Sequence, residues 1–126
     1  MNKQAGFTLI ELVAVMVILA LLGAMAVPRF ADVQTSAVEA VLDGTRNAVR
    51  SAHSIGIARE KDFPTVTMLQ GLVGGDTPLT AVATGLEFTV SGTTYTLQTY
   101  TDASCGSATA GVGDKVRCVG SVVANP

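Results

Sequence analysis

One apolar run dominates the N-terminal part of this 126-residue chain, covering residues 7–27 with Glu11 as its single charged residue. A helix of this length would rise about 30 Å, which is the hydrocarbon thickness of a bilayer. The run has no polar face. It therefore predicts a helix that can cross a membrane or lie inside a helical bundle.

A different pattern follows from residue 31 to residue 59, where apolar residues recur at three- and four-residue spacing. This spacing predicts an amphipathic helix that buries one face against the rest of the fold. Its apolar positions are Val38, Val41, Leu42, Val49, Ala52 and Ile55. Its charged positions are Glu39, Asp43, Arg46 and Arg50. These charges form either a solvated face or lateral contacts between copies, and Asp43 and Arg46 have the spacing of an ion pair.

Gly23 and Pro28 interrupt the helical pattern between these two segments. A proline inside a helix removes one backbone hydrogen bond and clashes with the preceding turn. We expect a kink or a locally melted stretch between the two residues. The alternative is a proline without mechanical effect at the end of the membrane span.

The helical pattern ends before Pro64, and alternating polar and apolar residues follow. Residues 86–90 and 95–99 both alternate, and Ser91-Gly92 between them has the composition of a tight turn, so an antiparallel hairpin is expected. Residues 66–72 fit either a short strand or a helical turn.

A third strand is expected around residues 115–119, and the last residues, 122–126, as an extended edge or a frayed end. Together these elements predict an α+β fold, with a long N-terminal helix packed on a small antiparallel sheet.

Cys105 and Cys118 are the only cysteines, without a Cys-x-x-Cys pair or a histidine cluster. Behind an export-type N-terminus, we expect them to form a disulfide outside the cytoplasm that closes a C-terminal loop. Two reduced, buried thiols are the alternative.

The charge and motif content argues against several functions. A formal net charge of −2 with 14% charged residues fits neither a basic nucleic-acid binder nor an acidic disordered tail. No nucleophile-elbow, phosphate-loop, dinucleotide or zinc pattern occurs. Asp76, Asp102 and Asp114 lack the spacing of a calcium loop, and the single histidine, His53, is expected on a helix surface. We therefore expect no enzymatic activity, no metal and no cofactor.

Three interpretations of the apolar run differ in the role of Glu11. A signal peptide would be cut after Ala26, but an acid weakens its apolar core. A plain anchor would leave Glu11 near the interface, where it can reach water. A cut between Gly6 and Phe7 would create an amine as its partner, either in the same chain at i,i+4 or in a neighbouring subunit. In a dry bundle such a pair would set the axial register, because an unpaired charge costs several kcal/mol there.

The segment GFTLIELVAVMVILALLGAMAVPRF, residues 6–30, resembles the N-terminal signature of class A type IV pilins and the related pseudopilins. Residues 28–59 are most similar to the mannose-sensitive haemagglutinin subgroup of pilins. The resemblance implies that an aspartic prepilin peptidase cuts after Gly6 and methylates the amine of Phe7. It also favours a hinge between Gly23 and Pro28 that loses helicity on assembly.

The resemblance further implies a homo-oligomeric, helical pilus used for adhesion, with motility and DNA uptake as other functions of the family. The expected partners are the inner-membrane assembly platform with its ATPase and an outer-membrane secretin. The precursor would lie in the inner membrane and the filament outside the cell. With few basic residues, no direct nucleic-acid binding is expected.

The chain is accordingly expected to divide into four parts. These are a leader, residues 1–6; a membrane or filament-core helix, residues 7–27; an amphipathic helix, residues 28–62; and a β head with a disulfide loop, residues 63–126. A type II secretion pseudopilin and a periplasmic domain released after Ala26 are the alternatives. Major pseudopilins usually carry an acidic calcium loop and lack a cysteine pair, and this chain shows the reverse, which favours a pilus subunit.

Overall fold

The computed structural model describes residues 6–74 and 78–126, and of Ala31 only the backbone. Of the predicted leader, only Gly6 lies within the described residues. Asp76 lies outside them. The chain forms two compact units, Met1–Ala37 and Val38–Pro126, which are described separately.

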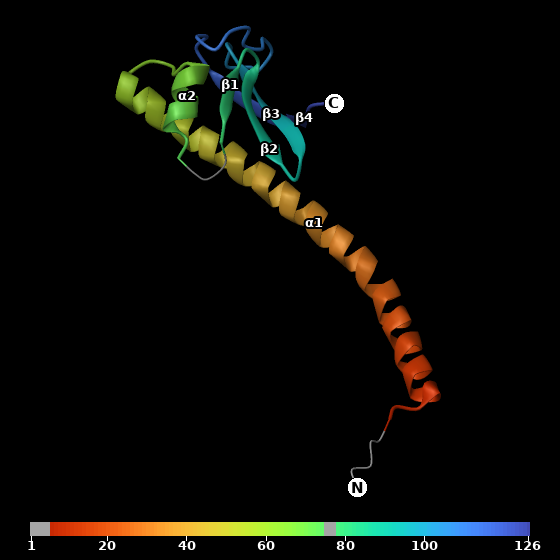
Figure 1. The fold of residues 1–126 in the computed structure, drawn as a ribbon. Coiled ribbons are helices and arrows are strands. Elements are labelled where there is room, and N and C mark those ends of the chain that lie inside the picture. The colour runs from red at the N-terminus through yellow and green to blue at the C-terminus, as the bar shows by residue number, and fades with distance from the viewer. Residues whose placement is uncertain (1–5, 75–77) are drawn as a thin grey trace. The chain divides into compact units, whose positions relative to one another are not determined.

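Helix α1, Leu9–Glu60, is the longest element and begins in the first unit (Figure 1). Its most apolar window has a mean hydropathy of 2.7, and none of that window is buried within the chain. Among the described residues, α1 is the one helix long and apolar enough to cross a membrane. The helix includes Gly23 and Pro28 without a break, so no melted stretch separates them here, and the hinge stays a prediction.

The second unit is built on a four-stranded antiparallel sheet in the order β1-β2-β3-β4. The strands are β1, Thr80–Val82; β2, Gly85–Val90; β3, Thr93–Tyr100; and β4, Cys118–Ala124. β2 and β3 form the predicted hairpin, with Phe88 opposite Tyr95. Ser91 and Gly92 both have positive φ, 51° and 82°, as the two central residues of a type I′ turn require. The α+β prediction is confirmed.

Residues 38–60 of α1 contribute their apolar stripe to the core of this unit. Val49 and Ala52 are buried together with Leu86 and Leu97 of the sheet. The predictions for Val41 and Ile55 are wrong, because 41% and 51% of their surfaces are exposed. Each lies one position before a residue of the buried stripe, Leu42 or Gly56, and one position turns a helix side chain by about 100°.

The segment after α1 forms α2, Val66–Leu72, which decides between the two predicted alternatives in favour of a helix. Thr65 caps it, since its hydroxyl accepts from the Met68 amide at 3.3 Å. Leu69 is fully buried. Gly56 lets the chain at Pro64 approach α1 closely, because a Cβ at Gly56 would lie 2.9 Å from the Pro64 ring.

The third strand was predicted too early in the chain. β4 begins at Cys118, whereas Lys115 bridges to Thr65, and the Val116 amide donates to the Pro64 carbonyl at 2.9 Å. This segment therefore pairs with the chain before α2 instead of extending β4. β4 is an edge strand that includes residues 122–124, as expected of an extended edge. The three-residue strand β1 was not predicted.

Candidate functional site

The N-terminus of α1 is closed by a reciprocal pair of hydrogen bonds between Thr8 and Glu11. The Thr8 amide donates to the Glu11 carboxylate at 2.9 Å, and the Glu11 amide donates to the Thr8 hydroxyl at 3.4 Å. The Thr8 hydroxyl also donates to the same carboxylate oxygen, Oε2, at 2.9 Å. The Thr8 carbonyl accepts from the Leu12 amide at 3.2 Å, which marks Thr8 as the residue that caps the helix. This arrangement is a capping box.

The capping box explains part of why a carboxylate occurs at Glu11. Its oxygen satisfies an amide that would otherwise lack a partner at the start of the helix, and its charge lies at the positive end of the helix dipole. This role was not predicted for Glu11, although its signal, Thr followed three residues later by Glu, is present in residues 8–11.

Phe7, the residue expected to carry the new amine, lies beside this carboxylate. Phe7 is 90% exposed, and an open apolar hollow is lined by Phe7, Glu11, Leu12, Ala14 and Val15. The structure therefore places Phe7, which precedes α1, and Glu11 of its first turn along the same hollow. Gly6 directly precedes Phe7, so both residues of the predicted cleavage bond lie within the described residues.

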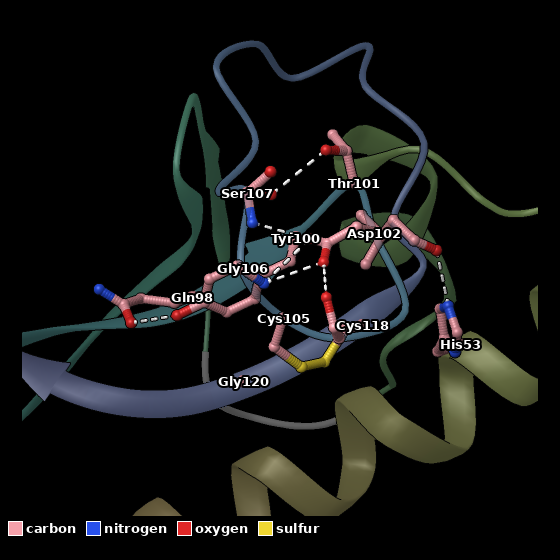
Figure 2. Close-up of a disulfide and its surroundings, with 12 residues drawn as sticks. His53, Gln98, Tyr100, Thr101, Asp102, Cys105, Gly106, Ser107, Cys118 and Gly120 are labelled. Atoms are coloured by element: carbon pink, nitrogen blue, oxygen red, sulfur yellow. Dashed lines mark hydrogen bonds between the residues drawn. A yellow bond between two sulfur atoms is a disulfide. The ribbon is translucent and has the colours of Figure 1, made fainter.

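At the other end of the chain, Cys105 and Cys118 form the predicted disulfide, with Cα atoms 5.5 Å apart (Figure 2). The bridge joins the loop after β3 to the first residue of β4. Cys105 has a φ of 57°, so the loop turns sharply at the bridge. The predicted disulfide is confirmed.

Asp102 organises the turn that carries Cys105 (Figure 2). Its carboxylate accepts from the Ser104 hydroxyl, from the Ser107 amide at 2.7 Å and from the Gly106 amide at 3.0 Å. These donors stabilise the charged form, with the Ser104 hydroxyl first, and lower the pKa of Asp102 to about 2. Asp102 is therefore a structural residue of the loop.

Asp114 has a similar role in the second turn of the loop, where it accepts from the Ala110 amide at 2.8 Å and the Gly111 amide at 3.0 Å. Within residues 6–74 and 78–126, no three His, Cys, Asp or Glu side chains lie together so that they could hold a metal ion.

His53 is half-buried, contrary to the expected surface position, because its Nε2 donates to the Val116 carbonyl at 2.7 Å. Its ring stacks on Phe63 with centroids 6.3 Å apart, and the Arg117 guanidinium lies 4.9 Å from the Phe63 centroid. The disulfide loop is thus attached to α1 through side chains that are far apart in the sequence.

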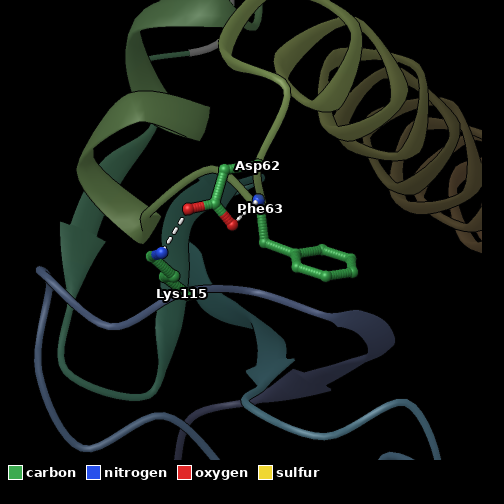
Figure 3. Close-up of polar contacts among 3 residues, drawn as sticks. All are labelled: Asp62, Phe63 and Lys115. Carbon is green, nitrogen blue, oxygen red and sulfur yellow. Dashed lines mark hydrogen bonds and ion pairs between the residues drawn. The ribbon is translucent and has the colours of Figure 1, made fainter.

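An ion pair between Lys115 and Asp62 adds to this attachment (Figure 3). The Asp62 carboxylate also accepts from the Phe63 amide at 2.7 Å. The bond to Lys115, and then the bond to the Phe63 amide, lower the pKa of Asp62. Both side chains of the ion pair are more than half exposed, so it contributes little to stability.

Comparison with known proteins agrees with the geometry of the N-terminus. Residues 1–27 match the prokaryotic N-terminal methylation motif. The chain is also 49% identical over 63 residues to the type IV narrow pilus major component PilA5 of Thermus thermophilus, which covers 50% of this chain and 54% of that protein. The chain thus matches about half the length of this curated relative. No solved structure matches the chain.

The finer similarity to the mannose-sensitive haemagglutinin subgroup stays a prediction. The chain carries the N-terminal methylation motif of type IV pilins and, over half its length, is similar to a major component of a type IV pilus.

Proposed function

We propose that this chain is the structural subunit of a type IV pilus and polymerises through the first half of α1. The observation that carries the proposal is the apolar window of α1, none of which is buried within the chain and which starts at the capping box inside the matched motif. Such a surface needs lipid or other helices around it. In a filament it would leave lipid for a bundle of its own copies, exchanging one apolar environment for another.

The proposed processing is removal of the leader, residues 1–6, by a prepilin peptidase, followed by methylation of the Phe7 amine. The cut leaves the capping box intact, since Thr8 and Glu11 both lie after Phe7. Thr8 binds Oε2 of the carboxylate, and we propose that Oε1 receives the amine of its own chain or of the next copy. The same carboxylate would then start the helix and set the axial register of the bundle.

We further propose that Gly23 and Pro28 form a hinge that opens on assembly. Both are helical here, but Pro28 has no amide hydrogen to donate to the preceding turn, so fewer backbone bonds are lost when this stretch opens. The hinge would lie between a filament-core helix, residues 7–27, and residues 28–62, which lead into the β head at residues 63–126.

The proposed location is the inner membrane for the precursor and the bacterial surface for the filament. The partners would be further copies of the chain, the prepilin peptidase, the assembly platform with its ATPase and the outer-membrane secretin. Adhesion is the proposed use of the pilus. The chain would act as a structural subunit and not as an enzyme.

The test uses two substitutions at one position. Glu11→Ala removes the charge and the capping oxygen, whereas Glu11→Gln keeps an oxygen that can cap the helix. We expect both variants to reach the membrane and both to form few or disordered filaments in electron micrographs of sheared cell-surface material. Asp32→Ala, which removes an exposed acid from the same helix, is the matched control and should polymerise normally.

Abundant, regular filaments from both Glu11 variants would refute the register role. If Glu11→Gln alone restored filaments, capping and not charge would be the function of Glu11. The intact mass of the mature protein provides an independent check: a methylated Phe7 start supports the proposal, and a Val27 start would show release after Ala26 and overturn it.

A further inference from the structure

A groove lies between α1 and the edge strand β4 in the second unit. Its lining residues are Glu39, Leu42, Asp43, Arg46, Ser121 and Val122. Leu42 and Val122 are partly buried against the core and form its apolar part. The groove therefore combines an apolar contact area with charged walls.

The two carboxylates of this groove, Glu39 and Asp43, form no ion pair with any residue that the structure describes. Glu39 and Asp43 are exposed neighbours at i,i+4 on α1, a spacing at which like charges repel. Neither carboxylate has a hydrogen-bond or ion-pair partner within the described part of the chain. Arg46 does not form the predicted pair with Asp43, because its Nε donates to the Gly120 carbonyl of β4 at 3.0 Å. Two carboxylates and one guanidinium leave the groove with a net charge of −1.

The opposite end of the same helical segment is basic. Its charged residues are Arg59, Glu60, Lys61, Asp62, Lys115 and Arg117, four cations and two anions with a net charge of +2. Lys115 is paired with Asp62, and Arg117 lies over the Phe63 ring. Arg59 and Lys61 are exposed and form no ion pair within the described ranges. They are therefore available to an external acidic partner.

We propose that the groove binds the basic end, Arg59 and Lys61, of a second copy of this chain. The inference rests on the proposed function, in which copies of α1 run parallel and are shifted along a common axis. At 1.5 Å per residue, Glu39 and Arg59 lie about 30 Å apart along α1, and Asp43 and Lys61, which directly follows the helix, lie about 27 Å apart. An axial shift of this size brings the basic end of one copy beside the acidic groove of the next.

Such a contact joins two different surfaces of the same chain. An interface of this kind repeats from copy to copy and produces an open helical filament, whereas a self-complementary patch would stop at a dimer. Each exposed ion pair contributes little by itself and is screened by salt. The contact would thus select the register between neighbouring heads, and filaments should become less stable in high salt.

The test reverses the charge of each surface separately and then together. We expect Glu39→Lys with Asp43→Lys, and likewise Arg59→Glu with Lys61→Glu, to lower filament yield about tenfold, because two attractive contacts per interface become repulsive. The chain with all four substitutions should recover filaments, since complementarity is restored with opposite signs. Arg50→Glu, at an exposed position of the same helix, is the control and should leave the yield unchanged.

Formation of the Cys105–Cys118 disulfide in membrane-held precursor shows that each variant has folded. Reduced yield in both reversals with recovery in the combined variant supports the proposal. If both charge reversals gave a normal filament yield while Glu11→Ala formed no filaments, the contact at the groove would be overturned and the proposed function would stand. A combined variant that stays as defective as its parents would overturn the contact too. Absence of filaments from the unaltered chain would overturn the proposed function first, and the contact with it.

Discussion

The buried pair Thr99 and Thr109 should make an unequal, coupled contribution to the stability of the head. Thr99 lies in β3 and Thr109 in the disulfide loop, and their exposed fractions are 0% and 2%. Their hydroxyl oxygens are 2.8 Å apart. The Thr109 hydroxyl also donates to the Thr99 carbonyl at 3.3 Å, so the Thr99 hydroxyl must donate to the Thr109 oxygen.

The two valine substitutions remove different parts of this arrangement. Thr109→Val leaves the buried Thr99 hydroxyl without an acceptor, which should lower the free energy of unfolding by about 1–3 kcal/mol. Thr99→Val leaves the Thr109 hydroxyl bonded to a carbonyl and should cost about 1 kcal/mol. The double variant leaves no unsatisfied hydroxyl. It should therefore cost no more than Thr109→Val alone, with a coupling free energy of about 1 kcal/mol.

Unfolding of the full-length protein in detergent by guanidinium would measure these differences. The chain contains no tryptophan, and its two tyrosines, Tyr95 and Tyr100, both lie in β3, so tyrosine fluorescence reports on this strand. Additive effects, with the double variant as unstable as the sum of the single ones, would refute the shared hydrogen bond. A larger loss for Thr99→Val than for Thr109→Val would refute the assigned direction of donation.

Two further predictions concern the disulfide loop. Replacing Cys105 and Cys118 by serine should lower the free energy of unfolding by about 3 kcal/mol in the same assay, because the bridge closes a loop over a sequence separation of 13; an unchanged midpoint would contradict this entropic account. The pKa of Asp102 is about 2 in the folded chain and about 3.9 in an unfolded one. The contribution of Asp102 to the free energy of unfolding is therefore complete above pH 4 and is lost as the pH falls towards 2. The Ser107 amide resonance, followed by NMR, should titrate near pH 2 and lose this response in Asp102→Asn, whereas a midpoint near pH 4 would show that the carboxylate is not held by the loop.

Local patterns were sufficient for the hairpin and for the apolar half of α1. Alternation at residues 86–90 and 95–99 needed only the Ser91-Gly92 turn to determine the register, because positive φ at both turn residues brings the strands directly opposite each other. The capping box at Thr8 and Glu11 was also readable from its spacing.

Long-range partners could not be read in the same way. His53 and Arg46 have the helical positions of surface residues, yet they bind carbonyls of Val116 and Gly120 that are 63 and 74 residues away. The start of β4 depends on a similar contact, since Val116 pairs with Pro64 before β4 can pair with β3. No local pattern records which backbone carbonyl a distant side chain will meet.

The sequence by itself determined the long apolar helix with one acidic residue, the amphipathic continuation, the hairpin and the cysteine pair, since each depends on periodicity, turn chemistry or compartment over a short stretch. Only the tertiary structure decided which positions of the amphipathic helix are buried, where β4 begins, and that Arg46 binds the edge strand instead of Asp43. These outcomes depend on how closely two segments approach in space. Packing, and not local propensity, therefore turned Arg46 towards β4 and left Glu39 and Asp43 without an ion-pair partner among the described residues.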